Sequence, residues 1–259
     1  MNLPDFGLGA LEADLWRLLF VMVRIGAAFM AAPIFGAGSV PVQVRIVLAG
    51  AIAVFVLAWT PVALPADLLS IAGLLALAGE VVIGLAFGFI LTLSFAAAVM
   101  AAEQIGGAMG MAIATAVDPN TGGQSGALGQ YFTLVLTLIF LGVGGHLIWL
   151  RLIVDSYIAL PPGTWLGAER AAAIAGFASA MFVAAVAIAL PVMLALLLVQ
   201  FATGVLSRSA PSLNLFSLGL PAGVMAGIAA LIAAMPLIGE QFVTLSGQAL
   251  DQVAQVIAS

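Results

Sequence analysis

The sequence contains neither cysteine nor lysine. Without cysteine the chain has no disulfides, no thiolate nucleophile and no cysteine-ligated metal site. Without lysine it has no phosphate-binding loop, because that motif needs a lysine after its glycines. Its six arginines face eleven acidic residues, for a net charge of -5. This balance excludes the basic surface of a nucleic-acid-binding protein and a polybasic lipid-binding patch.

Charge of either sign is scarce. Charged residues make up 7% of the chain and hydrophobic residues 64%, with a mean hydropathy of +1.30, whereas roughly a quarter of a soluble domain is charged. Most of the surface must therefore face lipid or other subunits. The first fourteen residues carry Asp5, Glu12 and Asp14 and no positive charge, unlike a cleavable signal peptide. We expect the first apolar helix to be retained.

Long uncharged stretches predict an all-α, membrane-type fold. A helix needs about 20 apolar residues to cross a bilayer core, and six stretches without any charge occur at 25–44, 46–66, 81–102, 119–150, 171–207 and 209–239. Pro161, Pro162 and Gly163 mark a turn. The stretch 171–207 is too long for one perpendicular span and contains Pro191. It predicts a kinked long helix or, preferably, two helices hinged near that proline.

Two polar intervals and a terminal pattern organise the rest of the chain. Residues 106–129 are rich in glycine, contain Asp118-Pro119-Asn120 and predict an irregular segment. Residues 207–214 predict a short hairpin connection. Residues 240–259 space apolar side chains among polar ones and predict an amphipathic helix.

Small residues recur four positions apart, and this spacing indicates close helix packing. The pattern includes Gly84 with Gly88, Gly106 with Gly110, and a tandem set at Gly219, Gly223 and Gly227. A helix face without side chains allows another backbone to approach closely.

Charges within apolar segments are costly unless they are paired or hydrated. Arg24 lies deep in its segment, so we expect it to have a partner. Three further charges lie near segment ends, namely Arg17, Glu80 and Glu103. Their side chains either snorkel to the membrane surface or belong to a water-lined path or a subunit contact. The arginines show little bias between the two sides of the predicted spans, so the positive-inside rule does not fix the topology.

Catalysis and metal binding are not expected. His146 is the only histidine; it has no evident nucleophile beside it for a Ser-His-Asp site, and we expect it to be hydrogen-bonded at a helix end. Met100, Met109 and Met111 could form a soft-metal path, although flexible apolar packing is favoured. Their place beside the glycine-rich interval offers a third role, the sealing of a constriction that must later deform.

Several short motifs follow one another along nearly the whole chain. They are Ala32-Pro33-Ile34, Val40-Pro41 with Arg45, 83–89, 102–106 with Met109-Gly110, Val117-Asp118-Pro119, Gly145-His146-Leu147, Val154-Asp155-Ser156, Leu160-Pro161 with Gly163, Ala189-Leu190-Pro191, 204–211 and Gly219-Leu220-Pro221. Together, in this order, they resemble the FliR family of flagellar export-gate proteins, whose virulence-secretion relatives form the SctT family. One departure is Ser212, where the family usually has glutamine.

The resemblance implies a single helical subunit of kinked hairpins. Residues up to about 165 would be FliP-like, and residues from about 166 to 259 would form a FliQ-like hairpin with the amphipathic C-terminal helix. The subunit would join homologues of FliP and FliQ in a helical, pore-forming assembly, with FlhB and FlhA homologues as further partners. The pore would lie in the bacterial inner membrane, at the flagellar basal body, and would pass unfolded flagellar proteins without a cofactor.

The resemblance also implies that a loop at 106–123 plugs the closed pore. An irregular segment at membrane depth is tolerated only where it is buried in protein or lines a cavity, and a plug does both. The expected site residues fall into three groups. They are Gly106, Gly107, Met109, Gly110, Met111, Asp118 and Pro119 for the plug, Gly84, Gly88, Gly219, Gly223 and Gly227 for subunit packing, and Arg24, Arg45, Glu103 and Arg208 as partnered charges.

Two other functions remain open on the residues alone. A secondary transporter would use broken helices around a midplane site, and both Pro191 and the 106–129 interval fit that pattern, but inverted repeats are not apparent. An intramembrane hydrolase would need a nucleophile near His146.

Overall fold

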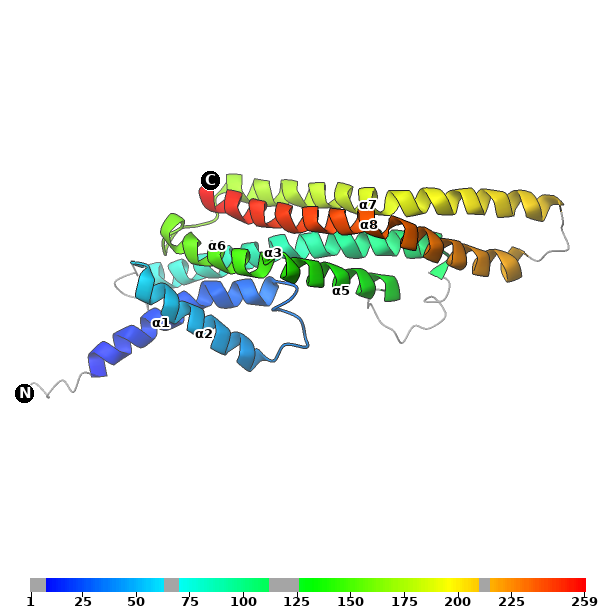
Figure 1. The fold of residues 1–259 in the computed structure, drawn as a ribbon. Coiled ribbons are helices and arrows are strands. Elements are labelled where there is room, and N and C mark those ends of the chain that lie inside the picture. The colour runs from blue at the N-terminus through cyan, green and yellow to red at the C-terminus, as the bar shows by residue number, and fades with distance from the viewer. Residues whose placement is uncertain (1–7, 63–69, 112–125, 210–214) are drawn as a thin grey trace, which may run out of the picture. The chain divides into compact units, whose positions relative to one another are not determined.

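The computed structural model describes residues 8–62, 70–111, 126–209 and 215–259, and this part of the chain is all-α (Figure 1). The all-α prediction is therefore confirmed. The helices described are α1 (Leu8–Ala31), α2 (Val42–Trp59), α3 (Ile71–Ala108), α5 (Ala127–Gly142), α6 (Gly145–Ala159), α7 (Ala168–Ser209) and α8 (Leu215–Ala258).

Four segments are long and apolar enough to cross a membrane, namely Val42–Trp59, Ile71–Ala108, Ala168–Leu206 and Pro221–Ala258. A fifth arises if the bent pair α5 and α6 is one span. The six uncharged stretches do not correspond to six helices. The first of them, at 25–44, contains the end of α1 at Ala31 and the start of α2 at Val42.

α7 corrects the prediction of two helices hinged at Pro191. The helix runs without interruption from Ala168 to Ser209 with Pro191 inside it, and α8 likewise contains Pro221 and Pro236. A proline removes only one backbone hydrogen bond. In an apolar surrounding, breaking the helix would leave further backbone groups without partners, so continuing it costs less.

A glycine corner separates α5 from α6. The two helix axes differ in direction by 68°, and Gly144 at the corner has a φ of 73°. This left-handed conformation carries a steric cost for residues with a Cβ. His146 lies in the first turn of α6, as expected of a helix-end residue, and its buried Nδ1 has no hydrogen-bond partner in the described part of the chain.

The chain divides into two compact units, each built from segments on both sides of position 165. One unit comprises residues 1–93, 144–177 and 248–259, and the other 94–143 and 178–247. In the first, three rings form a cluster: Phe35 stacks on Phe29 and on Trp149 with ring centroids 4.8 and 5.6 Å apart, and the Phe29 and Trp149 centroids are 6.0 Å apart. In the second, Phe132 meets Phe242 edge-on at 5.4 Å. These aromatic clusters mark the two cores.

Candidate functional site

The end of α3 contains the first residues of the predicted plug. Gly106 and Gly107 were expected in an irregular segment, but both lie in the last turn of the helix, which ends at Ala108. The helical hydrogen bond from the Met109 N–H to the carbonyl of Ile105 is 2.9 Å long. The chain leaves helical geometry at Gly110, whose φ is 82°. Backbone hydrogen bonding thus outweighs the low helix propensity of the paired glycines.

Met109, the residue after the end of α3, is buried, with 4% of its surface exposed. It packs against Gly227 of α8, and its backbone carbonyl faces Gly223 of the same helix. Two members of the tandem glycine set therefore receive a methionine of their own chain. Gly219 and Met111 are half-buried.

Two polar side chains also hold this region. The Gln200 side-chain amide, from α7, donates a hydrogen bond of 2.7 Å to the carbonyl of Ala108. Glu103, two turns before Gly110 on α3, accepts a hydrogen bond of 2.8 Å from the N–H of Gly126, the residue before α5. The expected partner of Glu103 is thus a helix N-terminus. Asp118 and Pro119 lie outside the described residues.

A buried ion pair lies in the other unit. Arg24 of α1 and Glu80 of α3 are both fully buried, and the guanidinium donates two hydrogen bonds of 2.8 Å to the two oxygens of the carboxylate. The same guanidinium donates to the Ser156 hydroxyl at 2.9 Å and to the Leu160 carbonyl at 2.7 Å. It also lies 4.2 Å from the ring centre of Tyr157. The cluster joins α1, α3 and the end of α6.

Sequence reasoning indicated a partner for Arg24 but did not identify Glu80, Ser156 or Tyr157. Glu80 borders an uncharged stretch and therefore looked like a residue at a span end, whereas α3 begins nine residues earlier at Ile71. The sequence did hold a signal for Glu80. A buried arginine needs an acidic partner, and few acidic residues lie within apolar segments, so Glu80 was one of a small number of candidates. Spacing alone gave no link between residues 56 positions apart.

The remaining predicted residues have contacts within the chain or are exposed. Gly84 and Gly88 were expected between subunits, but they pack against the backbone of α1, at Arg24 and Ala28 respectively. Arg45 donates to the carbonyls of Ala37 at 2.7 Å and Val40 at 3.0 Å, and so closes the turn before α2. Arg208 is exposed in the last turn of α7.

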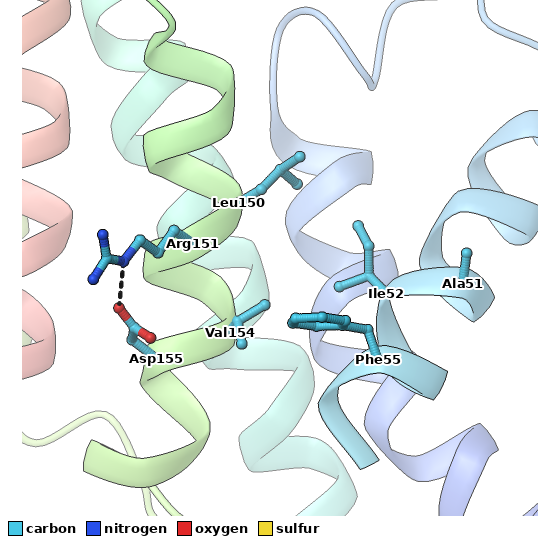
Figure 2. A pocket seen from close by; sticks show the side chains of 7 residues that line it. All are labelled: Ala51, Ile52, Phe55, Leu150, Arg151, Val154 and Asp155. Atoms are coloured by element: carbon cyan, nitrogen blue, oxygen red, sulfur yellow. Dashed lines mark ion pairs between the residues drawn. The ribbon is translucent and has the colours of Figure 1, made fainter. Parts of the chain in front are cut away.

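An apolar groove of about 570 Å³ lies between α2 and α6 (Figure 2). Arg151 and Asp155, both on α6, form an ion pair at 3.5 Å at its edge, and both side chains are more than half exposed. No group of three histidine, aspartate or glutamate side chains that could hold a metal occurs among the described residues. The groove residues are Ala51, Ile52, Phe55, Leu150, Arg151, Val154 and Asp155.

Comparison with known proteins gives a consistent picture. Residues 15–249 match the family model described as bacterial export proteins, family 1. The flagellar biosynthetic protein FliR of Escherichia coli strain K12 is 33% identical over 244 residues, which cover 94% of this chain and 92% of the relative. FliR of Bacillus subtilis strain 168 is 35% identical over 225 residues, or 85% and 86% of the two chains. The Yop proteins translocation protein T of Yersinia pestis is 31% identical over 157 residues, 59% of each chain.

Proposed function

The chain belongs to family 1 of the bacterial export proteins and is a component of the flagellar export apparatus, and we propose that it forms the export pore of that apparatus together with homologues of FliP and FliQ. The observation that carries the proposal is the family match over nearly the whole chain. The pore passes unfolded flagellar proteins. The family consists of membrane proteins of the export apparatus, which are not enzymes. The chain is a protein of the inner membrane.

The uneven burial of the apolar helices supports assembly with partners. In the most apolar stretch of α3, 56% of the residues are buried within the chain. The corresponding share is 17% in α2, 28% in α7 and 17% in α8. Exposed apolar surface of this extent marks contact with lipid or with other subunits. We assign part of it to FliP and FliQ homologues in a helical assembly, in which residues to about 165 act as a FliP-like part and the remainder as a FliQ-like hairpin. Homologues of FlhB and FlhA are the further partners.

The gate of this pore is assigned to the region that begins at the end of α3. Gly110 with its positive φ gives the backbone a point of departure from the helix, and Met109 and Met111 supply deformable apolar side chains. We assign four further residues to the gate, namely Gly106, Gly107, Asp118 and Pro119.

Co-purification tests the proposed function. The tagged chain is expressed with and without FliP and FliQ homologues of the same bacterium, and the membranes are solubilised in mild detergent. A stable complex of the three, together with restored motility in a strain lacking its own FliR, is the expected result. A lone chain that remains monomeric beside both partners and takes up a solute in liposomes would establish the transporter reading instead.

A further inference from the structure

We propose that Met109, Gln200 and Glu103 act together as a latch that positions the end of α3 in the closed gate. The proposal rests on the proposed function and adds the contacts that keep the gate shut. The three contacts join the last turns of α3 to three other elements: α8 through Met109, α7 through Gln200, and the start of α5 through Glu103. All lie within one compact unit.

The methionine contact depends on a missing side chain. A methyl group added at Gly227 would lie 2.7 Å from both Sδ and Cε of Met109, closer than nonbonded carbon atoms approach. Glycine at 227 therefore makes the space that Met109 fills. At Gly223, one turn earlier on α8, an added methyl group would lie 3.4 Å from the nearest atom, the Met109 carbonyl oxygen. An added methyl group therefore fits at Gly223 but displaces the Met109 side chain at Gly227.

The contact of Gln200 provides a hydrogen-bond donor for the C-terminal end of α3. The last carbonyls of a helix have no partner within it, and an unpaired carbonyl in an apolar surrounding is costly. The Gln200 amide donates to one of these carbonyls, that of Ala108. Gln200 is the one glutamine of the uncharged stretch 171–207. If the end of α3 moves away, this hydrogen bond breaks.

The glutamate contact joins α3 to α5 through electrostatics. The first N–H groups of a helix carry partial positive charge and favour a nearby carboxylate. The Glu103 carboxylate accepts the hydrogen bond from Gly126, the N-cap residue of α5. The start of α5 is thereby fixed to α3 within two turns of the methionine contact. Each of the three contacts is weak alone, so an exported chain that pushes on this region can break them in turn.

The first test compares the two glycines of α8 in cells that carry the complete export apparatus. Gly227→Ala displaces the Met109 side chain, so passive ion leak, read with a membrane-potential dye, should rise several-fold. Gly223→Ala is the matched control and should leak no more than wild type. Equal leak of both variants and wild type, with normal amounts of assembled complex, would overturn the methionine contact.

The second test removes the polar contacts one at a time. Gln200→Leu keeps the size of an exposed side chain and removes the donor, so it should raise the leak. Thr203→Val is its control, because the Thr203 hydroxyl donates a hydrogen bond to the carbonyl of Gln200 within its own helix. Glu103→Ala should raise the leak more than Glu103→Gln, which keeps an acceptor for the Gly126 N–H. Wild-type leak in both Gln200→Leu and Glu103→Ala would overturn the polar contacts.

Failure of the latch can be told apart from failure of the proposed function. If the wild-type chain neither joins the FliP and FliQ homologues nor restores motility, the proposed function fails. If it does both, and the latch variants assemble and remain as ion-tight as wild type, only the latch fails.

Discussion

At the scale of single residues, the buried pair of Arg24 and Glu80 is the strongest electrostatic feature of the described chain. A lone charge at the centre of a membrane helix costs about 2.5–3.5 kcal/mol on insertion scales. Here the two charges neutralise each other, and two of the remaining N–H groups of the guanidinium donate to the Ser156 hydroxyl and the Leu160 carbonyl. The cluster therefore sets how α1, α3 and α6 meet.

Removal of one partner should destabilise the protein strongly. Arg24→Met leaves the Glu80 carboxylate buried without its cation, and such losses cost about 3–5 kcal/mol. The measurement is the free energy of unfolding of the purified protein by denaturant in detergent micelles. The double variant Arg24→Met with Glu80→Met should recover part of the loss, because no unpaired charge remains.

Arg151→Met is the control for that prediction. Its ion pair with Asp155 is exposed, and such a pair contributes about 0.3–0.5 kcal/mol. A loss at Arg24 no larger than at Arg151 would contradict a structural role for the buried cluster.

The sequence predicts a contact where the free-energy cost of burying one residue, such as a charged side chain, makes a partner necessary. It does not predict which residue that partner is, because the answer depends on how two helices pack. The depth of Arg24 in an apolar segment made a partner necessary. Which acid supplied it depended on how α1 and α3 meet, and nothing local specifies that meeting. Similarly, Gln200 carries no motif, and its contact with Ala108 follows only from the tertiary structure.

At the scale of elements, α3 and α1 approach closely because Gly84 and Gly88 carry no side chains. A methyl group added at Gly88 would lie 2.6 Å from the Ala31 Cβ and 2.8 Å from the Ala32 backbone nitrogen. Backbone atoms of a packed helix cannot move aside as a flexible side chain can. The Thr92 hydroxyl, one turn further along α3, donates to the Ala31 carbonyl at 2.5 Å.

Gly88→Ala should therefore separate α1 from α3 and lower stability, by about 1–3 kcal/mol as for overpacked cores. The thermal unfolding midpoint of the detergent-solubilised protein measures the effect. Gly176→Ala on α7 is the matched control, because nothing lies within 4 Å of an added methyl group there. It should leave the midpoint unchanged or raise it, since alanine favours a helix over glycine. Equal midpoints for the two variants would refute close packing at Gly88.

Element boundaries were harder to predict than element type. The apolar stretches gave the all-α class, but Pro191 suggested a break in a helix that continues, and the glycines at 106 and 107 suggested an early end to α3. Both errors have one cause. Local propensity is a weak preference, and long helices in apolar surroundings keep their backbone hydrogen bonds in spite of it.

At the scale of the whole molecule, the apolar surface exceeds what the chain itself covers. On α7, Leu198 and Phe201 are 71% and 73% exposed. Composition predicted that much of the surface avoids water, but it could not divide that surface between lipid and protein, because both partners are apolar.

Two substitutions at Leu198 test whether this face of α7 contacts lipid or protein. Leu198→Ala only removes packing, so it should leave the amount of chain in the membrane unchanged and reduce co-purification of the proposed partner subunits if this face meets protein. Leu198→Arg places a charge on the same face and should reduce co-purification further. Undiminished co-purification of Leu198→Ala, together with reduced membrane levels of Leu198→Arg alone, would assign this face to lipid.

The uncovered helices have a consequence for the life of the chain in the cell. The chain itself buries 56% of the most apolar stretch of α3, but only 17% of that of α2, 28% of that of α7 and 17% of that of α8. A protein that displays unsatisfied apolar surface is recognised by chaperones and degraded by quality-control proteases. In the proposed assembly, partner subunits cover part of this surface. We therefore expect copies made in excess of their partners to be degraded, so that the abundance of the subunit follows the supply of its partners.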